Sequence, residues 1–257
     1  MKNQYFGDIR DLFKYDLISW IIQRIDSIDR FTFVPMLTED DNKSHGHKRD
    51  FKRAVKQRKP GTKNEELMKF LITYDDDQKK RDIRKIKEYF KSCGIKTVIY
   101  RESEPFKHKD RVEYFKNIDG ELLSDSLIFL DPDIGLEVKR SRKEHLLYSE
   151  VKELYEKMNE NAILMIYQHF PRARGRHEEY LPDGRSKKLG EIAGDLPLYI
   201  SDNEIFFLFL TKNAELKKKL FEILSEYKDC YKCLEISSEP VISSLSTDSQ
   251  PHDTQTG

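Results

Sequence analysis

Two aspartates stand directly behind an apolar stretch of the chain. Leu127–Leu130 is an unbroken apolar run, and Asp131-Pro132-Asp133 follows it. Carboxylates are hard oxygen ligands, so this pair could gather magnesium or manganese together with Glu137, His169 and Asp40, as a metal-dependent nuclease or phosphodiesterase requires. Alternatively, the aspartates are ordinary turn residues and Gly135 ends the turn.

A buried strand is the element that would position these carboxylates. A short apolar run with β-branched and aromatic members is typical of a strand buried on both faces of a parallel sheet. Proline cannot donate a ladder hydrogen bond, so we expect the strand to end at Pro132. Asp131 and Asp133 then lie at the carboxyl edge of the sheet, where open α/β folds bind their ligands.

A histidine follows a second apolar stretch. Ala162–Tyr167 is followed by Gln168 and His169, and residues 143–159 before it have the spacing of a helix. Strand, helix and strand in this order predict a parallel crossover, which brings His169 to the edge that carries Asp131. A histidine in this position can be a core residue, but its polar neighbours favour a catalytic role.

A compact polar cluster precedes the first helical pattern. Apolar residues recur at helical spacing from Leu12 onward, and either Asp8 or Asp11 can cap the helix. Gly7, Asp8, Asp11 and Lys14 therefore stand where a helix begins and where free backbone N–H groups can bind a ligand. The alternative is a capped and solvated first turn.

Two segments are rich in basic residues. Seven Lys and Arg residues lie between Lys48 and Lys59, a pattern that can bind phosphates but is more often a solvated helix face. Residues 172–188 include several arginines, show no periodicity and are expected to form a long loop beside the sheet edge. A basic loop over an acidic site suits a polyanion, so we expect it to position the phosphates of RNA or DNA through Arg172, Arg174 and Arg176.

The composition narrows the class of protein. The 257 residues carry 46 Lys and Arg and 46 Asp and Glu, so affinity for nucleic acid must come from local patches. No apolar run has the length of a membrane span and no signal peptide is recognisable, which favours a cytoplasmic protein without a membrane partner. Cys93, Cys230 and Cys233 are too scattered for a disulfide framework, and one C-x-x-C pair gives only weak support to zinc.

The alternation of strands and helices predicts an α/β fold. Further strands are expected at Phe31–Leu37, Thr97–Tyr100 and Leu198–Leu210, and further helices at residues 65–74, 77–93, 110–117 and 212–227. We expect a Rossmann-like three-layer fold with a mostly parallel sheet, formed by a single domain of residues 1–235 with a helical insertion around residues 48–93. Residues 236–257 are poor in apolar side chains and are expected to form a disordered tail.

The order of these motifs resembles class I S-adenosylmethionine-dependent methyltransferases, and most closely the bacterial large-subunit ribosomal RNA adenine-N6 methyltransferase family. Members open with Gly-Asn-x-x-Asp-x-x-Lys-His before a helix, where this chain has Gly7-Asp8-Ile9-Arg10-Asp11-Leu12-Phe13-Lys14-Tyr15. Their catalytic Asp-Pro-Pro-Tyr ends the fourth strand, where this chain has Asp131-Pro132-Asp133-Ile134. The chain is also similar to bacterial proteins of unassigned activity with an opening like Tyr-Phe-Gly-Asp and an Asp-Pro-Asp-x-Gly-Leu-Glu core. The resemblance covers residues 5–225 as an ordering of short motifs.

The resemblance implies roles for particular residues. Asp131 would accept a hydrogen bond from the exocyclic amine of a nucleic-acid base, with Asp133 and His169 beside it. S-adenosylmethionine would be bound by Gly7, Asp8, Asp11, Lys14 and Asp40.

The chain departs from the family pattern at two places. A glycine-rich turn normally lets the cofactor approach the backbone, whereas residues 38–47 contain one glycine. The second proline and the aromatic of the catalytic motif are replaced by Asp133 and Ile134, so Phe170 or another ring would have to stack on the extruded base.

Three functions remain open, and we rank them in this order. The first is methyl transfer from S-adenosylmethionine to a base amine, the second is metal-dependent cleavage of nucleic acid, and the third is a non-catalytic Rossmann-like binding module. All three require that three segments meet at one edge of the sheet: the opening turn (Gly7, Asp8, Asp11 and Lys14), the acidic stop (Asp131-Pro132-Asp133) and His169.

Overall fold

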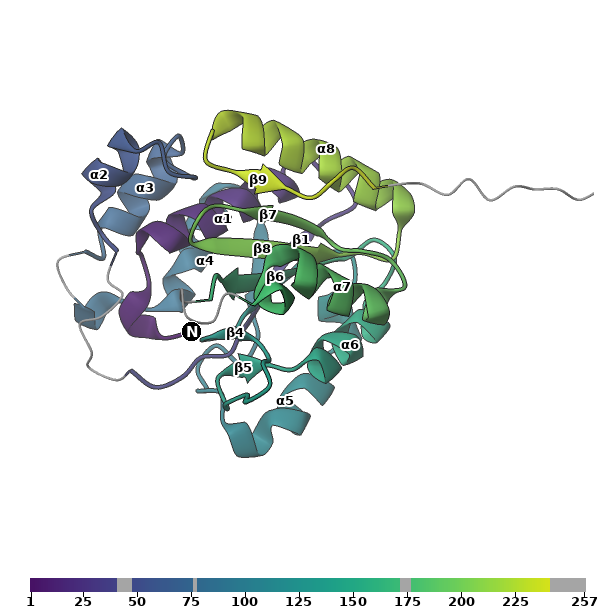
Figure 1. Cartoon of the computed structure of the whole chain (residues 1–257). Helices are drawn as coiled ribbons and strands as arrows, with labels where there is room; N and C mark the ends of the chain where they lie inside the picture. The colour runs from purple at the N-terminus through teal and green to yellow at the C-terminus, as the bar shows by residue number, and fades with distance from the viewer. Residues whose placement is uncertain (41–47, 76–77, 172–176, 241–257) are drawn as a thin grey trace, which may run out of the picture.

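A seven-stranded sheet forms the centre of the molecule (Figure 1) in a computed structural model that describes residues 1–40, 48–75, 78–171 and 177–240. Its strands lie in the order β2 (Lys96–Ile99), β1 (Arg30–Pro35), β3 (Ser126–Asp131), β6 (Ile163–His169), β8 (Ile205–Leu210), β7 (Leu198–Ser201) and β9 (Glu235–Ile236). The first four strands in this order are parallel, and β8 runs antiparallel to both of its neighbours. The predicted α/β, Rossmann-like fold with a mostly parallel sheet is therefore confirmed.

Helices cover both faces of the sheet. They are α1 (Ile9–Ile22), α2 (Phe51–Lys56), α3 (Glu65–Ile72), α4 (Ile86–Ser92), α5 (Arg111–Lys116), α6 (Tyr148–Lys157), α7 (Pro182–Ala193) and α8 (Ala214–Cys230). One hydrophobic core is formed by side chains from α1, α3, α4 and α8 together with one face of the sheet. A second core is formed by side chains from α5, α6 and α7 together with the other face. The result is the expected three-layer arrangement.

The alternation of side chains along the central strands produces these two cores. Phe31 and Phe33 of β1 and Phe129 of β3 point into the first core, whereas Val34 and Ile128 point into the second. Successive residues of a strand face opposite sides of a sheet, so a strand covered on both sides needs apolar residues at every position. This requirement explains why β3 and β6 are unbroken apolar runs.

Three predicted elements differ from the observed ones. The helix expected at residues 143–159 begins only at Tyr148, because His145–Leu146 forms a short strand (β5) that pairs with β4 (Gly135–Leu136). The helix expected at 77–93 is a 3-10 turn (Ile83–Lys85) followed by α4. The loop expected at 172–188 was the largest error, since α7 begins at Pro182.

Helix α7 was not predicted because it contains a proline and a glycine, two residue types that usually break helices. Pro182 stands in the first turn, where a missing N–H costs nothing. Gly184 is required because a Cβ at this position would lie 2.2 Å from the Glu178 carbonyl oxygen. A pattern with both residues therefore resembles a loop although the backbone is helical.

Within the described ranges, no helix has both the length and the apolar character needed to cross a lipid bilayer. The tail expected from residue 236 begins with Ile236 paired to Ile200 of β7, and residues 241–257 lie outside the described residues.

Candidate active site

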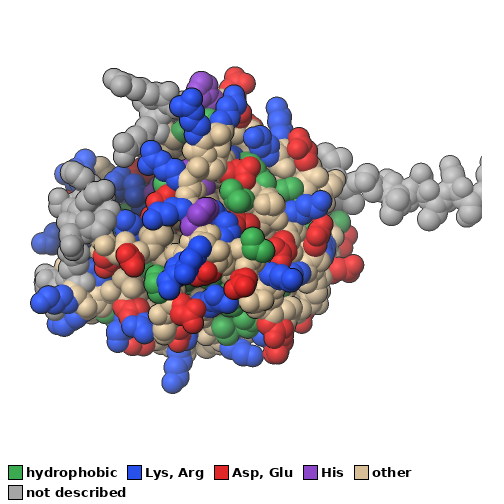
Figure 2. All heavy atoms as spheres, turned by 90° about the horizontal axis from the view of Figure 1, so that it is seen from below, with side chains coloured by type: hydrophobic (Ala, Val, Ile, Leu, Met, Phe, Trp, Pro, Cys, Tyr) green, Lys and Arg blue, Asp and Glu red, His purple; other side chains and the backbone are tan. Residues whose placement is uncertain are grey.

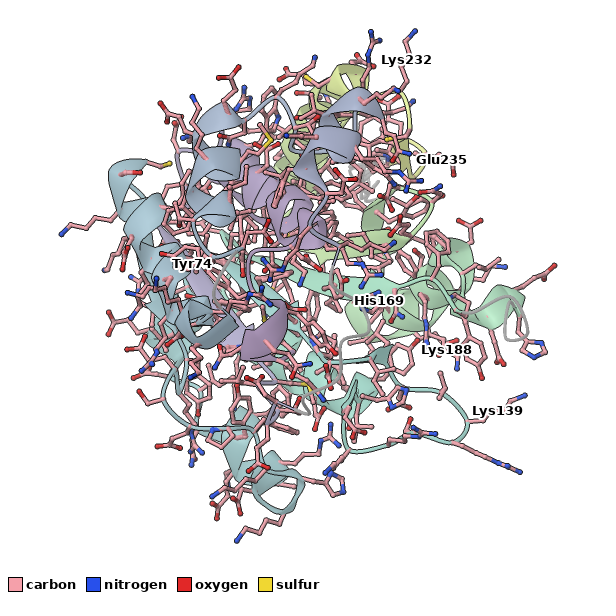
Figure 3. The ribbon with its side chains drawn as sticks, turned by 90° about the vertical axis from the view of Figure 1, so that its left-hand side faces the viewer. Tyr74, Lys139, His169, Lys188, Lys232 and Glu235 are labelled. Atoms are coloured by element: carbon pink, nitrogen blue, oxygen red, sulfur yellow. The ribbon has the colours of Figure 1, made fainter. Side chains whose placement is uncertain are left out.

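A cavity of about 390 Å³ lies where the carboxyl ends of β3 and β6 meet the beginning of α1. Three segments that are far apart in the sequence contribute its central polar side chains: Asp8, Asp11 and Lys14 at the start of α1, Asp131 and Asp133 after β3, and Tyr167 and His169 on β6. Figure 3 shows His169 near the middle of this side of the molecule, with Lys188 and Lys139 farther toward one edge. The opening turn, the acidic stop and the histidine thus share one rim of the sheet.

The beginning of α1 is built by its own aspartates. Asp8 is the N-cap, and its carboxylate accepts hydrogen bonds from the backbone N–H groups of Arg10 (2.8 Å) and Asp11 (3.0 Å). Asp11 in turn accepts from the N–H of Gly7 at 2.8 Å, and Gly7 has a φ of +85°, which favours glycine. These bonds use the N–H groups that were expected to be free for a ligand, so that expectation is wrong.

The first turn is nevertheless not a solvated one. Asp8, Asp11 and Lys14 are 4%, 2% and 5% exposed. Buried charges are costly unless they are paired, so a cluster of this kind needs a structural or a functional reason. A helix cap alone does not require Lys14.

Lys14 joins the start of α1 to the end of β3. Its Nζ lies 2.8 Å from Oδ2 of Asp131 and 3.3 Å from Oδ1 of Asp11, and it sits 4.1 Å from the centre of the Tyr167 ring. Burial lowers the pKa of an ammonium, but the carboxylates of Asp131 and Asp11 outweigh that effect and raise the pKa of Lys14 above its ordinary value. Lys14 is therefore a fixed positive charge in the site.

The carboxyl groups of Asp8 and Asp11 have pKa values above the ordinary value of an aspartate. Burial raises the pKa of Asp11 to about 7, against the opposing charge of Lys14. Burial also raises the pKa of Asp8, again against Lys14. A small change in pH near neutrality therefore changes the charge that the cavity presents to a ligand.

His169 stays neutral in this environment. Burial, together with the charges of Arg10 and Lys14, lowers the pKa of His169 to about 3. The hydroxyl of Tyr167 lies 3.2 Å from Nε2 and 3.4 Å from Nδ1 of His169. The imidazole can therefore exchange hydrogen bonds with a ligand or with Tyr167, but it is not a cation at neutral pH.

The residues after Asp133 are locked to the end of β6. Gly135 has a φ of +118°, and a Cβ there would lie 2.5 Å from the amide of Gln168. That amide accepts from the N–H of Leu136 at 2.7 Å and donates to the carbonyl of His169 at 2.7 Å. The acidic stop and the histidine are thus held in one rigid unit.

Several predicted site residues lie elsewhere. Asp40 is exposed and accepts from the backbone N–H of Gln4 at 3.0 Å, and it lines a neighbouring cavity of about 510 Å³ that also includes Asp133. Phe170 packs edge-on against Phe206, with ring centres 5.0 Å apart, and does not line the main cavity. It is therefore not placed to stack on a ligand there.

The predicted arginines cannot be placed, because Arg172, Arg174 and Arg176 lie outside the described residues. Arg185, from the same basic segment, is 1% exposed and donates to the carbonyls of Glu137 (2.6 Å) and Leu136 (3.2 Å). It supports the backbone after β4 and is not available for phosphates. On the face seen in Figure 2, positive and negative side chains are interspersed, as expected for zero net charge.

The structure gives no support to a metal site. Among the described residues, no group of three His, Cys, Asp or Glu side chains is placed to hold a metal ion. The Glu137 carboxylate accepts from the N–H of Tyr148 at 3.0 Å and does not line the cavity, while Lys14 donates to Oδ2 of Asp131.

Met1, Lys2, Tyr5, Arg10 and Tyr167 also line the cavity and were not predicted as site residues. Tyr167 stands two positions before His169, and residues two apart share one face of a strand, so the strand pattern contained this signal. Arg10 stands four positions before Lys14, which places both on one face of α1.

Neither protein-family models nor curated proteins give a match to this chain. Function is therefore inferred from the geometry and chemistry of the cavity.

Proposed function

We propose that this chain is an S-adenosylmethionine-dependent, methyltransferase-like enzyme that acts on an amine of a nucleic-acid base. The observation that supports it best is the pair formed by Asp131 and Lys14 at the carboxyl edge of the sheet. The motif resemblance assigns the amine acceptor to Asp131, and the cavity around it has the size of a small-molecule site.

The donor set of the cavity fits this cofactor. S-adenosylmethionine carries a sulfonium, an ammonium and a carboxylate, and when bound it supplies an electrophilic methyl group. Asp8 and Asp11 offer negative charge for its cationic groups, while Asp133 is paired with the N-terminal ammonium of Met1 at 3.5 Å. Gly7 lets the chain turn beside them. The glycine-poor segment after β1 contributes Asp40, but only at the neighbouring cavity.

Asp131 would orient the target amine. Lys14 occupies its Oδ2, and no described residue donates to Oδ1, which leaves that oxygen for an amine N–H. Lys14 also keeps the carboxylate oriented, so the amine would be held in a fixed direction. Positioning of this kind, with electrostatic stabilisation, is the main contribution a protein makes to methyl transfer.

The neutral imidazole of His169 would accept a hydrogen bond from the same amine. It is held beside Tyr167 and is uncharged at neutral pH. We therefore assign it a role in orienting the amine.

The test is isothermal titration of the protein with S-adenosylmethionine, followed by transfer of a labelled methyl group to RNA and DNA. We expect one molecule to bind per chain. Asp131→Asn should retain binding and lose methyl transfer by a factor of about 100 or more, as expected when the group that positions the amine loses its charge.

Two outcomes would reject the proposal. Absence of binding heat together with absence of a thermal shift would exclude the cofactor. Cleavage of nucleic acid with magnesium or manganese, abolished by Asp131→Ala and Asp133→Ala, would instead establish the nuclease. Asp29→Asn is a suitable control, because Asp29 lies at the opposite end of β1 from the cavity.

A further inference from the structure

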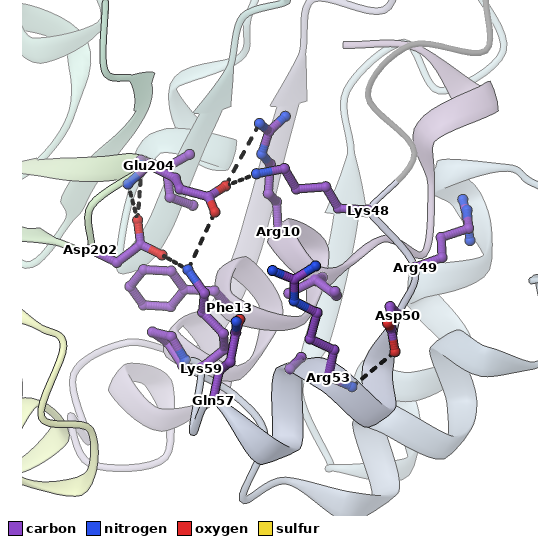
Figure 4. A pocket seen from close by; sticks show the side chains of 14 residues that line it. Arg10, Phe13, Lys48, Arg49, Asp50, Arg53, Gln57, Lys59, Asp202 and Glu204 are labelled. Carbon is purple, nitrogen blue, oxygen red and sulfur yellow. Dashed lines mark hydrogen bonds and ion pairs between the residues drawn. The ribbon is translucent and has the colours of Figure 1, made fainter.

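A second cavity, of about 350 Å³, lies beside the first (Figure 4). It is enclosed by the start of α1, by α2 with its flanking residues, and by the turn between β7 and β8. Arg10, Lys48, Arg53 and Lys59 contribute basic side chains to its lining, and Asp50, Asp202 and Glu204 contribute acidic ones. Lys59 also lies 3.8 Å from the carboxylate of Asp202. The sequence identified the basic stretch at 48–59 but gave no sign of Glu204.

Glu204 gathers three of these cations. Its carboxylate forms an ion pair with Lys48, lies 3.3 Å from Nζ of Lys59 and lies 3.9 Å from the guanidinium of Arg10. One anion therefore holds together cations that come from three separate segments of the chain.

The turn fixes the position of this carboxylate. Asp202 accepts hydrogen bonds from the backbone N–H groups of Glu204 (2.6 Å) and Ile205 (2.8 Å). Burial works to raise the pKa of Glu204, but the bond from Lys48 and the charge of Lys59 outweigh it and lower the pKa. The cations thus face a permanent negative charge at neutral pH.

The cavity retains capacity for a further anion. The guanidinium of Arg53 forms no hydrogen bond or ion pair with any other described residue, and Figure 4 shows it directed toward Lys48 and Glu204. Nε of Arg10 is buried and also lacks a partner within the described part of the chain. A buried N–H without an acceptor is costly, and a planar guanidinium matches the oxygens of a phosphate.

Arg10 connects this cavity to the candidate active site, because its side chain lines both. The two cavities therefore adjoin at Arg10, and a ligand long enough to occupy both would contact this residue. In a nucleic-acid strand, a target base and the neighbouring backbone phosphate are linked through the sugar. The base would lie in the candidate active site and the phosphate in the second cavity.

We propose that Arg10, Lys48, Arg53 and Lys59 form a subsite for a backbone phosphate of a single nucleic-acid strand. In the free protein the Glu204 carboxylate pairs with Arg10, Lys48 and Lys59, and the phosphate displaces it when the strand binds. This inference rests on the proposed function for the identity of the strand as substrate. It goes beyond the proposed function by giving the position of the strand's phosphate and by identifying Glu204 as the carboxylate that competes with that phosphate.

The test measures the binding of labelled single-stranded RNA and DNA oligonucleotides of about ten nucleotides by fluorescence anisotropy, without S-adenosylmethionine. We expect Arg53→Gln to weaken binding about tenfold at low salt and to reduce the salt slope by about 0.7, the loss of one phosphate contact on a single strand. Glu204→Gln should have the opposite effect and tighten binding by about threefold or more, because the cations are released from their internal partner.

Lys56→Gln is the matched control. Lys56 is exposed on the same helix α2 and carries the same charge, but it does not line the cavity. We expect its affinity to stay within about twofold of the unmodified protein, since a distant exposed charge is screened. Inorganic phosphate should compete with the oligonucleotide in the unmodified protein and less in Arg53→Gln.

Three outcomes would overturn the inference. Equal losses for Arg53→Gln and Lys56→Gln would show general charge attraction instead of a subsite. Unchanged or weaker binding in Glu204→Gln would show that the carboxylate does not compete, and undetectable oligonucleotide binding would remove the ligand altogether. Arg53-dependent binding in a protein that fails to bind S-adenosylmethionine would reject the proposed enzyme and leave the phosphate subsite standing.

Discussion

Two aspartates of helix α1, Asp11 and Asp16, are both buried, and burial raises the pKa of both carboxyls. Their partners differ. Asp16 accepts from the amide of Asn64 at 2.8 Å and from the hydroxyl of Tyr227 at 2.7 Å, which are neutral donors. Asp11 is paired with the charged Lys14, which also serves Asp131.

The difference separates a carboxyl that is satisfied within the fold from one that lines the cavity. The Asp16 network ties α1 to α8 and to the cap of α3, since Asn64 also accepts from the N–H of Leu67 at 3.0 Å. Its donors satisfy the carboxylate within the fold. The Asp11 region has Asp8, Asp11 and Asp131 around Lys14 and lines a cavity, so its charged groups lie within reach of a ligand.

The largest effect is expected when the cation of the Asp11 region is removed. Lys14→Met should lower the free energy of unfolding by about 3–5 kcal/mol at neutral pH, because it leaves buried carboxylates unpaired. Chemical denaturation measures this loss.

The loss in Lys14→Met should also depend on pH. Without the lysine, the folded-state pKa of Asp11 rises further above its unfolded value, so the folded form binds protons more strongly. Stability should therefore be regained as the pH falls from about 7 to about 5. A loss below about 1 kcal/mol, or one independent of pH, would mean that the cluster is not held by this ion pair.

A smaller and purely structural effect is expected in the Asp16 region. Tyr227→Phe should cost about 1–3 kcal/mol, because a buried carboxylate loses one donor while the ring remains in place. Affinity for S-adenosylmethionine should not change. A comparable loss of cofactor affinity would show that the two aspartates are not functionally separate.

The smallest effect concerns the pH dependence of cofactor binding. Asp11 ionises with a pKa of about 7 and the sulfonium is a cation, so affinity should rise as Asp11 loses its proton. We expect an increase of about fivefold between about pH 6 and about pH 8, measured by titration calorimetry.

Three variants sharpen this prediction. Asp11→Asn retains the acceptor for the Gly7 N–H but loses the charge, and it should abolish the pH dependence. Asp16→Asn should retain it, and so should His169→Asn, because His169 titrates only near pH 3. S-adenosylhomocysteine, which lacks the sulfonium charge, should show a weaker dependence in the unmodified protein.

The central sheet and the convergence of the site were accessible from the sequence for one physical reason. Strands buried on both faces, such as Leu127–Leu130, are recognisable without tertiary information, and the carboxyl ends of parallel strands meet at one edge. The residues that directly follow such strands could therefore be placed near one another. Asp131 and His169 were found by this argument.

The pairings within the site could not be obtained in the same way. The bond between Lys14 and Asp131 joins residues 117 positions apart, and it depends on how α1 is rotated over the sheet. Arg185 shows the opposite difficulty, since a basic residue in an aperiodic segment resembles a surface arginine although it is buried against backbone carbonyls. Charge alone does not reveal burial, and periodicity fails where a helix contains proline and glycine.

The contact between Gly135 and Gln168 has a consequence for related sequences. The amide of Gln168 fills the space in which any side chain at position 135 would begin, so the two positions constrain each other's volume. Homologues that keep this geometry should retain the glycine and the glutamine jointly or exchange them jointly. A chain that changed one without the other would have to rebuild the path from its acidic turn to its histidine.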